Sequence, residues 1–213
     1  MLSVVVVFFA VSASAEHINW TTWSTNTFGN INNSGITVTY AGELGGLSGP
    51  DYPSWLPATT YSGGTVDNPP VSSGQMVQLS GGNMNVNSIT FSAPVQDPVM
   101  AIWSLGQAFE EARFAFDGSE PFTIESGGPS QEFGGSSIAL CGDDAFAVCG
   151  LESNGTIQFH GTFTKISWTN PEYEFYYGFT VGVPGEVPEP STILLLAPGL
   201  LAGFGVIRRS LSL

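Results

Sequence analysis

Basic residues are scarce in this 213-residue sequence, which has four Lys and Arg against 18 Asp and Glu. Only Arg113 and Lys165 lie between Glu16 and Glu189, whereas all 18 acidic residues do, so this portion has a net charge of −16. A nucleic-acid-binding surface needs clustered Lys or Arg to release the counterions of the phosphates. Two isolated cations cannot do this, so the composition excludes a nucleic-acid partner and is typical of a highly soluble domain.

Histidine and cysteine, which often supply a base, a nucleophile or a metal ligand, are nearly absent too. The only histidines are His17, close to the start of the chain, and His160, on the polar face of an expected strand. Cys141 and Cys149 are the only cysteines, and their close spacing predicts a disulfide that closes a short hairpin. A metal site would need more ligands. We therefore expect no catalytic residue, no cofactor and no metal site.

Helical periodicity is lacking before residue 187, and the pattern of alternating apolar residues predicts an all-β fold. Turns rich in Gly, Asn, Ser and Pro separate about ten such segments, which favours a β-sandwich or jelly roll over residues 16–186. Val99 to Leu105 is apolar on both faces and is predicted to be a central, buried strand. A change of parity near Thr164-Lys165 predicts a β-bulge.

The last strand of this domain has the clearest pattern. Apolar residues occupy alternate positions without interruption, which predicts one buried face and excludes a helix. These residues are Tyr173, Phe175, Tyr177, Phe179, Val181 and Val183.

The N-terminus resembles a secretory signal peptide. An apolar stretch from Val4 to Val11 precedes Ala13 and Ala15, which form the A-x-A pattern of a cleavage site. We therefore expect residues 1–15 to direct export through the Sec machinery and the mature chain to begin at Glu16. Residues 1–3 carry no Lys or Arg, which departs from the usual positively charged beginning of such a segment.

The C-terminus predicts a single transmembrane helix. Thr192 to Ile207 is a run of sixteen residues without a charge, and Arg208 and Arg209 follow it. As a helix the run would extend about 24 Å at 1.5 Å per residue, which approaches the ~30 Å of a hydrocarbon core. The two arginines would stay in the cytoplasm, so residues 16–191 are expected outside.

The order Pro188-Glu189-Pro190, apolar span and Arg208-Arg209 resembles the PEP-CTERM sorting signal of exported bacterial proteins. The resemblance covers about residues 187–211. It implies a Gram-negative source and an exosortase that recognises the Pro-Glu-Pro motif and removes the tail. The protein would be held in the inner membrane with its domain in the periplasm, then pass to the cell surface or the exopolysaccharide matrix. Residues 99–107 and 166–183 also look like β-rich cargo domains of such proteins. We expect a non-catalytic, structural role in the matrix.

Two other functions remain open from the residues themselves. A carbohydrate-binding module could use aromatic residues of the long segment from Gly42 to Gln75, although aromatics of a sandwich more often belong to its core. These residues are Tyr52, Trp55 and Tyr61, with Trp20 and Trp23 as further candidates. A glycoside hydrolase could use Glu172 and Glu174, which share one strand face.

Acidic pairs also offer oxygen ligands for Ca²⁺. Asp143-Asp144 lies inside the expected disulfide loop, and Asp117 lies close to Glu120 in the sequence. Neither pair belongs to an EF-hand or nonapeptide motif, so solvent-exposed turns are the simpler interpretation.

Overall fold

The computed structural model describes residues 15–43, 45–49, 53–72 and 75–185. The fold is all-β, as predicted, and the described part contains one short helix, α1 (Ala58–Tyr61). The strands are β1 (Ile18–Thr25), β2 (Phe28–Ile31), β3 (Thr37–Ala41), β4 (Gly46–Leu47), β5 (Val77–Gln96), β6 (Val99–Leu105), β7 (Ala112–Phe116), β8 (Phe122–Gly128), β9 (Ser136–Ser137), β10 (Ala139–Cys141), β11 (Asp144–Gly150), β12 (Ser153–Phe159) and β13 (Thr162–Pro184).

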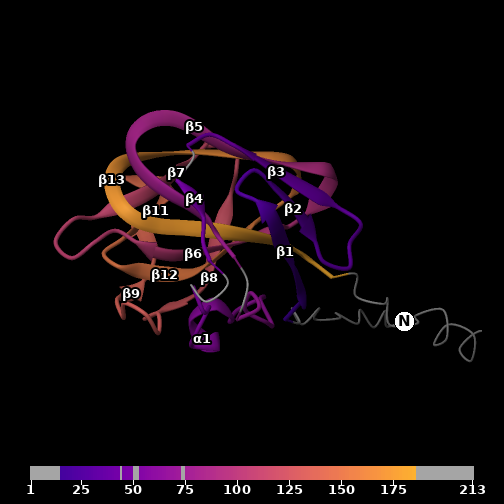
Figure 1. Ribbon diagram of the computed structural model, residues 1–213, viewed down its shortest axis with the longest axis horizontal. Coiled ribbons are helices and arrows are strands. Elements are labelled where there is room, and N and C mark those ends of the chain that lie inside the picture. Colours follow the sequence, from indigo (N-terminus) through magenta and orange to yellow (C-terminus); the bar gives the residue numbers. More distant parts are fainter. Residues whose placement is uncertain (1–14, 44, 50–52, 73–74, 186–213) are drawn as a thin grey trace, which may run out of the picture.

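The strands form one hydrogen-bonded sheet that folds over itself into a sandwich-like arrangement (Figure 1). The long strands β5 and β13 bend, so each contributes to both layers. In one layer the start of β5 and the end of β13 pair with each other, and β13 continues to β6, β12 and β8. In the other layer the end of β5 and the start of β13 pair again, flanked by β3 and β2 on one side and by β7, β11 and β10 on the other.

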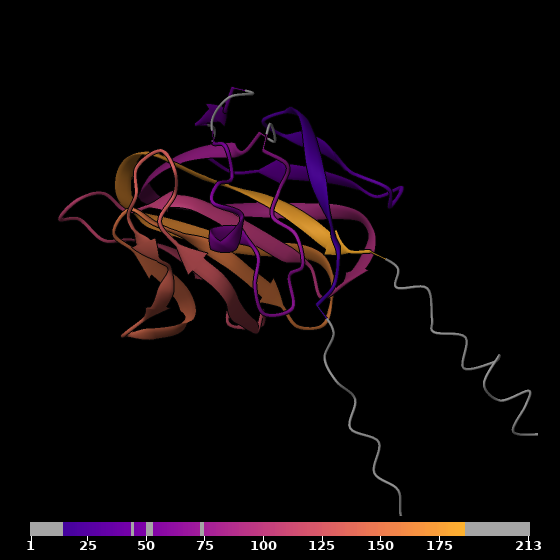
Figure 2. The same ribbon diagram turned by 90° about the horizontal axis from the view of Figure 1, so that it is seen from below.

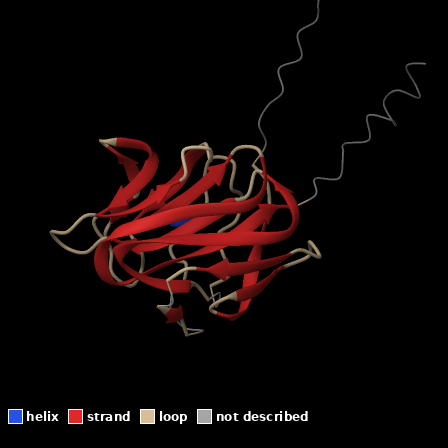
Figure 3. Cartoon of the chain, turned by 90° about the horizontal axis from the view of Figure 1, so that it is seen from above, coloured by secondary structure: helices blue, strands red, loops and turns tan. Residues whose placement is uncertain are grey.

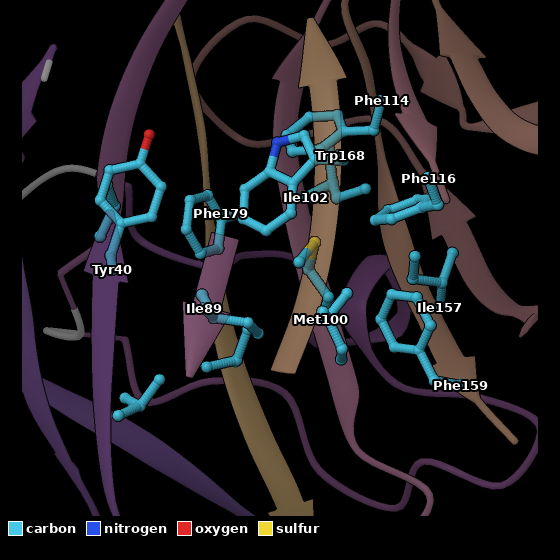
Figure 4. Close-up of a cluster of buried hydrophobic side chains, with 14 of the residues drawn as sticks. Tyr40, Ile89, Met100, Ile102, Phe114, Phe116, Ile157, Phe159, Trp168 and Phe179 are labelled. Atoms are coloured by element: carbon cyan, nitrogen blue, oxygen red, sulfur yellow. The ribbon is translucent and has the colours of Figure 1, made fainter. Parts of the chain in front are cut away.

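The space between the layers is filled by large apolar and aromatic side chains (Figure 4). Trp168, near the start of β13, packs edge-on against Phe179, near its end, with ring centroids 5.0 Å apart. The strand therefore supplies both walls of the core. Met100 and Ile102 of β6 enter this core, which is consistent with inward-facing residues at alternate positions.

Strand β6 is buried on both faces, which confirms its prediction as a central strand. Its other face carries Val99, Ala101 and Trp103, which belong to a second apolar cluster. Trp55 and Tyr61 complete that cluster from the segment that contains α1, which crosses the outside of the layer (Figure 2). The long Gly- and Pro-rich segment thus covers the sheet.

The predicted bulge and disulfide are both present. The register of β13 against β5 shifts between Phe163 and Lys165, as the change of parity indicated. Cys141 and Cys149 form a disulfide that joins the adjacent strands β10 and β11 at one edge of the sheet. The bond closes a short hairpin and stabilises it locally.

We expect the double replacement Cys141→Ala with Cys149→Ala to lower the free energy of unfolding by about 2–3 kcal/mol, because the closed loop no longer restricts the unfolded chain. Urea unfolding followed by circular dichroism measures this change. The native spectrum should persist, since the two residues with Ala147 form only a small cluster. Reduction of the wild-type protein should produce a similar loss, and an unchanged unfolding midpoint in both experiments would contradict the assignment.

The two ends of the described chain lie at one end of the domain. Ile18 of β1 pairs with Pro184 of β13, so the chain enters and leaves side by side. The bends of β5 and β13 lie at the opposite end (Figure 1, Figure 3). The domain therefore has an end where the chain continues and a distal end formed by the two bends.

Candidate functional site

The bend of β13 departs most from the burial expected from the sequence. Tyr173 and Phe175, predicted to be buried, are 57% and 74% exposed, whereas Glu174 between them is only 4% exposed. The prediction of one unbroken apolar face was wrong at these two aromatic positions. The register against β5 shifts between Tyr173 and Tyr177, and this irregularity exchanges the two faces of the strand. Downstream, the predicted apolar residues Tyr177, Phe179, Val181 and Val183 are buried, and the residues between them are buried as well, so both faces of this part of β13 are covered.

Glu174 connects the bend to the loop that follows β6. Its Oε2 accepts a hydrogen bond from the backbone N–H of Gly106 at 2.7 Å. Burial raises the pKa of Glu174 to about 8, the Gly106 hydrogen bond opposes this rise and the charge of Glu152 adds to it. Gly106 has φ +79°, and a Cβ there would lie 2.0 Å from the carbonyl oxygen of Gly150. The loop is therefore held by contacts that only glycine permits at this position.

The loop between β6 and β7 presents a phenylalanine to solvent. The backbone N–H groups of Gln107 and Glu110 each donate to the other residue's carbonyl oxygen at 3.0 Å, which closes a tight turn. The side chains of these residues also meet, with Gln107 Nε2 2.7 Å from Glu110 Oε2. Phe109, inside the turn, is fully exposed and has φ +76°. A bulky residue in the left-handed region costs about 1–2 kcal/mol, so both its conformation and its exposure are unfavourable.

These exposed rings lie at the distal end of the domain. The β6–β7 loop projects beside the bend of β13 in two perpendicular views (Figure 1, Figure 2). We call the exposed side chains of Phe109, Tyr173 and Phe175 the aromatic end. On neighbouring β5, Met84 is exposed as well. The sheet thus displays a group of large apolar side chains where its two longest strands turn.

The charge beside the aromatic end is acidic. Arg113 is one of the two basic residues in the described part of the chain. Its Nε lies 3.0 Å from Glu172, and its Nη1 lies 3.1 Å from Asp143. The guanidinium is therefore already engaged by two carboxylates.

Polar atoms with incomplete hydrogen bonding gather behind the bend, around Gly81 of β5. Glu43 Oε1 accepts hydrogen bonds from the backbone N–H groups of Ser80 and Gly81. The buried Oη of Tyr177 and the Oε2 atoms of Glu43 and Glu172 have no hydrogen-bond partner among the described residues. Burial of unpaired polar groups costs free energy. The distal end therefore carries features that stability alone does not explain.

The aromatic residues predicted as a sugar platform lie in the core instead. Trp55 and Tyr61 are completely buried and pack edge-on against each other, with centroids 5.1 Å apart. Trp20 and Trp23 are buried as well. Tyr52 lies outside the described residues. The described rings of the 42–75 segment therefore offer no face to a sugar, because they cover the outer side of β6.

The carboxylates considered for hydrolysis are engaged in structural contacts. Glu174 is buried under the β6–β7 loop, and Glu172 forms an ion pair with Arg113. The predicted common face of Glu172 and Glu174 is replaced by these different environments. His160 lies on the exposed surface, with its Nε2 2.9 Å from Thr123 Oγ1. Both cysteines are in the disulfide.

The acidic pairs considered for Ca²⁺ do not form a cluster of ligands. Within the described ranges, no group of three or more His, Cys, Asp or Glu side chains is arranged to hold a metal ion. Asp143 pairs with Arg113, whereas Glu120 is buried and accepts a hydrogen bond from the backbone N–H of Ser167 at 2.8 Å. Burial raises the pKa of Glu120 to about 7.

The residues predicted to direct export and sorting lie outside the described residues, apart from Ala15. They comprise Ala13, the motif Pro188, Glu189 and Pro190, and the arginines Arg208 and Arg209. The predicted membrane helix lies outside them as well. Among the residues that the structure describes, no helix has the length and apolar character needed to cross a membrane.

Comparison with known proteins identifies no relative: no family model, curated protein or solved structure matches the chain.

Proposed function

We propose that this chain is a non-catalytic exported bacterial protein that an exosortase sorts to the cell surface or the exopolysaccharide matrix. The observation that carries the proposal is the sequence of three elements near the C-terminus, which are Pro188-Glu189-Pro190, the apolar run from Thr192 to Ile207, and Arg208-Arg209. Proline favours an extended backbone and has no backbone N–H, and both properties suit recognition of such a motif by an enzyme at the membrane surface. In this proposal residues 16–186 are the cargo domain, and its architecture is a β-sandwich or jelly roll.

In this proposal the Sec machinery exports the chain, and the run from Thr192 to Ile207 anchors it as a single helix in the inner membrane. The domain stays in the periplasm until processing releases it. Two features of the domain support an extracellular destination. The Cys141–Cys149 disulfide suits an oxidising compartment, and the net charge of −16 between Glu16 and Glu189 favours solubility outside the cell.

A structural role, rather than catalysis, is supported by the way the domain uses its reactive side chains. The two carboxylates with the most suitable sequence positions, Glu172 and Glu174, are held in an ion pair and in a buried hydrogen bond. Both cysteines form the disulfide. These four side chains are thus engaged in contacts that hold the fold together.

Replacement of Pro188, Glu189 and Pro190 by alanine is expected to move the protein from the extracellular and surface fractions to the inner-membrane fraction, because the exosortase no longer recognises the tail. Cell fractionation with immunoblotting measures this distribution. Replacing the exposed Asp67, which lies outside the distal end, by alanine is a matched control that changes one acidic residue of the cargo and should leave the location unchanged. Identical size and location of the motif variant and the wild type would refute the sorting proposal.

A further inference from the structure

The aromatic end combines three features that a domain built only for stability would avoid. Tyr173 and Phe175 face solvent at positions where the alternation of the strand would bury them, and Glu174 takes the buried position. Phe109 is fully exposed in a left-handed conformation that Gly or Asn would adopt at lower cost. Local violations of sequence patterning of this kind are expected at functional sites.

The support of the three rings is shared. Glu174 lies between Tyr173 and Phe175 in the strand, and its Oε2 accepts a hydrogen bond from the backbone N–H of Gly106, where the loop of Phe109 begins. The turn of that loop is closed by two backbone hydrogen bonds and by the contact between Gln107 and Glu110. The rings are therefore displayed by an ordered framework, which lowers the entropy lost on binding a ligand.

Electrostatics decides among the partners that an aromatic surface could contact. Glu110, Glu111 and Glu172 flank the rings, and Arg113 is neutralised by its two carboxylate partners. An anionic polymer or an anionic lipid surface would be repelled, and a second copy of the chain would bring the same excess of negative charge to the contact. A neutral ligand has no such penalty.

We propose that the aromatic end binds a neutral polysaccharide. The apolar C–H faces of pyranose rings would pack on Phe109, Tyr173 and Phe175, as aromatic surfaces accept apolar faces elsewhere. The amide of Gln107 and the carboxylate of Glu110, which meet beside Phe109, supply a donor and an acceptor for vicinal hydroxyl groups. The site lies at the end of the domain away from β1 and the end of β13, so a bound polymer leaves the entry and exit of the chain accessible.

This inference rests on the proposed function only in placing the protein where polysaccharide is found. The location experiment measures delivery in cells, whereas the experiment below measures binding by the purified protein. Each can fail while the other succeeds.

The test is co-sedimentation of the full chain, kept in a mild detergent, with insoluble cellulose and insoluble β-1,3-glucan, and affinity electrophoresis in dextran. We expect retention on at least one of these neutral polymers, with little dependence on salt concentration. The triple variant Phe109→Asn, Tyr173→Ser, Phe175→Ser should bind at least tenfold more weakly. Phe28→Ser, which changes a partly exposed phenylalanine of β2, is the matched control and should bind as the wild type does.

The variants should keep the circular dichroism spectrum of the wild type, because the replaced rings are exposed. The single variant Tyr173→Ser is a second binding test that changes only one exposed ring and so disturbs the fold least. Absence of retention on all three neutral polymers would overturn the proposal, as would equal binding by the wild type and the Tyr173→Ser and triple variants. Binding to alginate in preference to the neutral polymers, or self-association in sedimentation velocity that the triple variant abolishes, would assign the aromatic end to another partner.

Discussion

Replacement of Trp103 by alanine is expected to lower the free energy of unfolding by about 3–5 kcal/mol. The side chain is completely buried on the outer face of β6, where it packs against Phe133 and Tyr176 with ring centroids 5.2 and 5.6 Å away. Its Nε1 donates a hydrogen bond to Glu132 Oε2 at 3.2 Å. The variant thus loses apolar contacts and leaves a carboxylate with one partner fewer. Denaturant unfolding followed by tryptophan fluorescence and circular dichroism measures the loss.

The matched control for this variant is Phe175→Ala, which removes an aromatic ring from an exposed position. We expect it to change the free energy of unfolding by no more than about 0.5 kcal/mol, as substitutions at exposed sites usually do. The comparison tests whether the segment containing α1 forms a true second core on β6. A loss below about 1 kcal/mol for Trp103→Ala, which is the size expected of a substitution outside a packed core, would contradict that arrangement.

The second large effect is a fall in stability as the pH rises. Burial raises the pKa of Glu174 to about 8, above the value of 4.5 expected for an exposed glutamate. Between these values the folded protein holds a proton that the unfolded chain has released, so the free energy of unfolding falls with rising pH. The slope from one such group reaches at most about 1.4 kcal/mol per pH unit. Glu120, whose pKa is raised to about 7, adds to the slope over a narrower range.

Glu174→Gln isolates this contribution. The amide oxygen can still accept the hydrogen bond from Gly106, and the buried charge is absent at every pH. We expect the variant to match the wild type near pH 5, to be more stable at pH 8, and to have a flatter pH profile in between. Urea unfolding at a series of pH values measures both profiles. Glu152, the acidic neighbour of Glu174, is present in both proteins and therefore does not contribute to the difference between them. The same slope in both proteins would show that Glu174 does not carry the effect.

Much of the fold follows from local patterns in the sequence. Strand β6 is apolar at every position except Ser104 because both of its faces are covered, and a nearly continuous apolar run indicates such a strand. The disulfide follows from two cysteines that are close in the sequence, and the bulge at Phe163 to Lys165 follows from the change of parity. In each case the physical cause acts within a few residues of the pattern that reports it.

The aromatic end could not be predicted in this way, because its cause is the pairing of distant strands. Tyr173 and Phe175 continue the alternation of the buried residues after them, and only the register shift between β13 and β5 turns them outward. The signal available in the sequence was indirect: Asn170-Pro171, before the aromatics, and the pair Gly81-Gly82 on β5 mark positions where regular pairing breaks. Gly81 has φ +62°, a left-handed conformation that glycine adopts readily, so it permits the break in pairing at this position.

Trp55 and Tyr61 differ from the sequence-based interpretation in the opposite direction, because they were considered as exposed rings and are buried. Their Gly- and Pro-rich surroundings suggested a loop that presents rings to a ligand, whereas the rings are the means by which this segment attaches to β6. Composition describes the backbone of such a segment but not the side of the sheet on which it packs. The sequence of β6 indicated this packing indirectly, because a strand with apolar residues on both faces needs a covering segment on each side.

The most direct test of the proposed function is the intact mass of the wild-type protein recovered from the extracellular fraction of its producing cells. We predict a chain that begins at Glu16, retains the Cys141–Cys149 disulfide and lacks the apolar run from Thr192 to Ile207. An extracellular chain that still contains this run and ends with Arg208 and Arg209 in place would contradict processing by an exosortase.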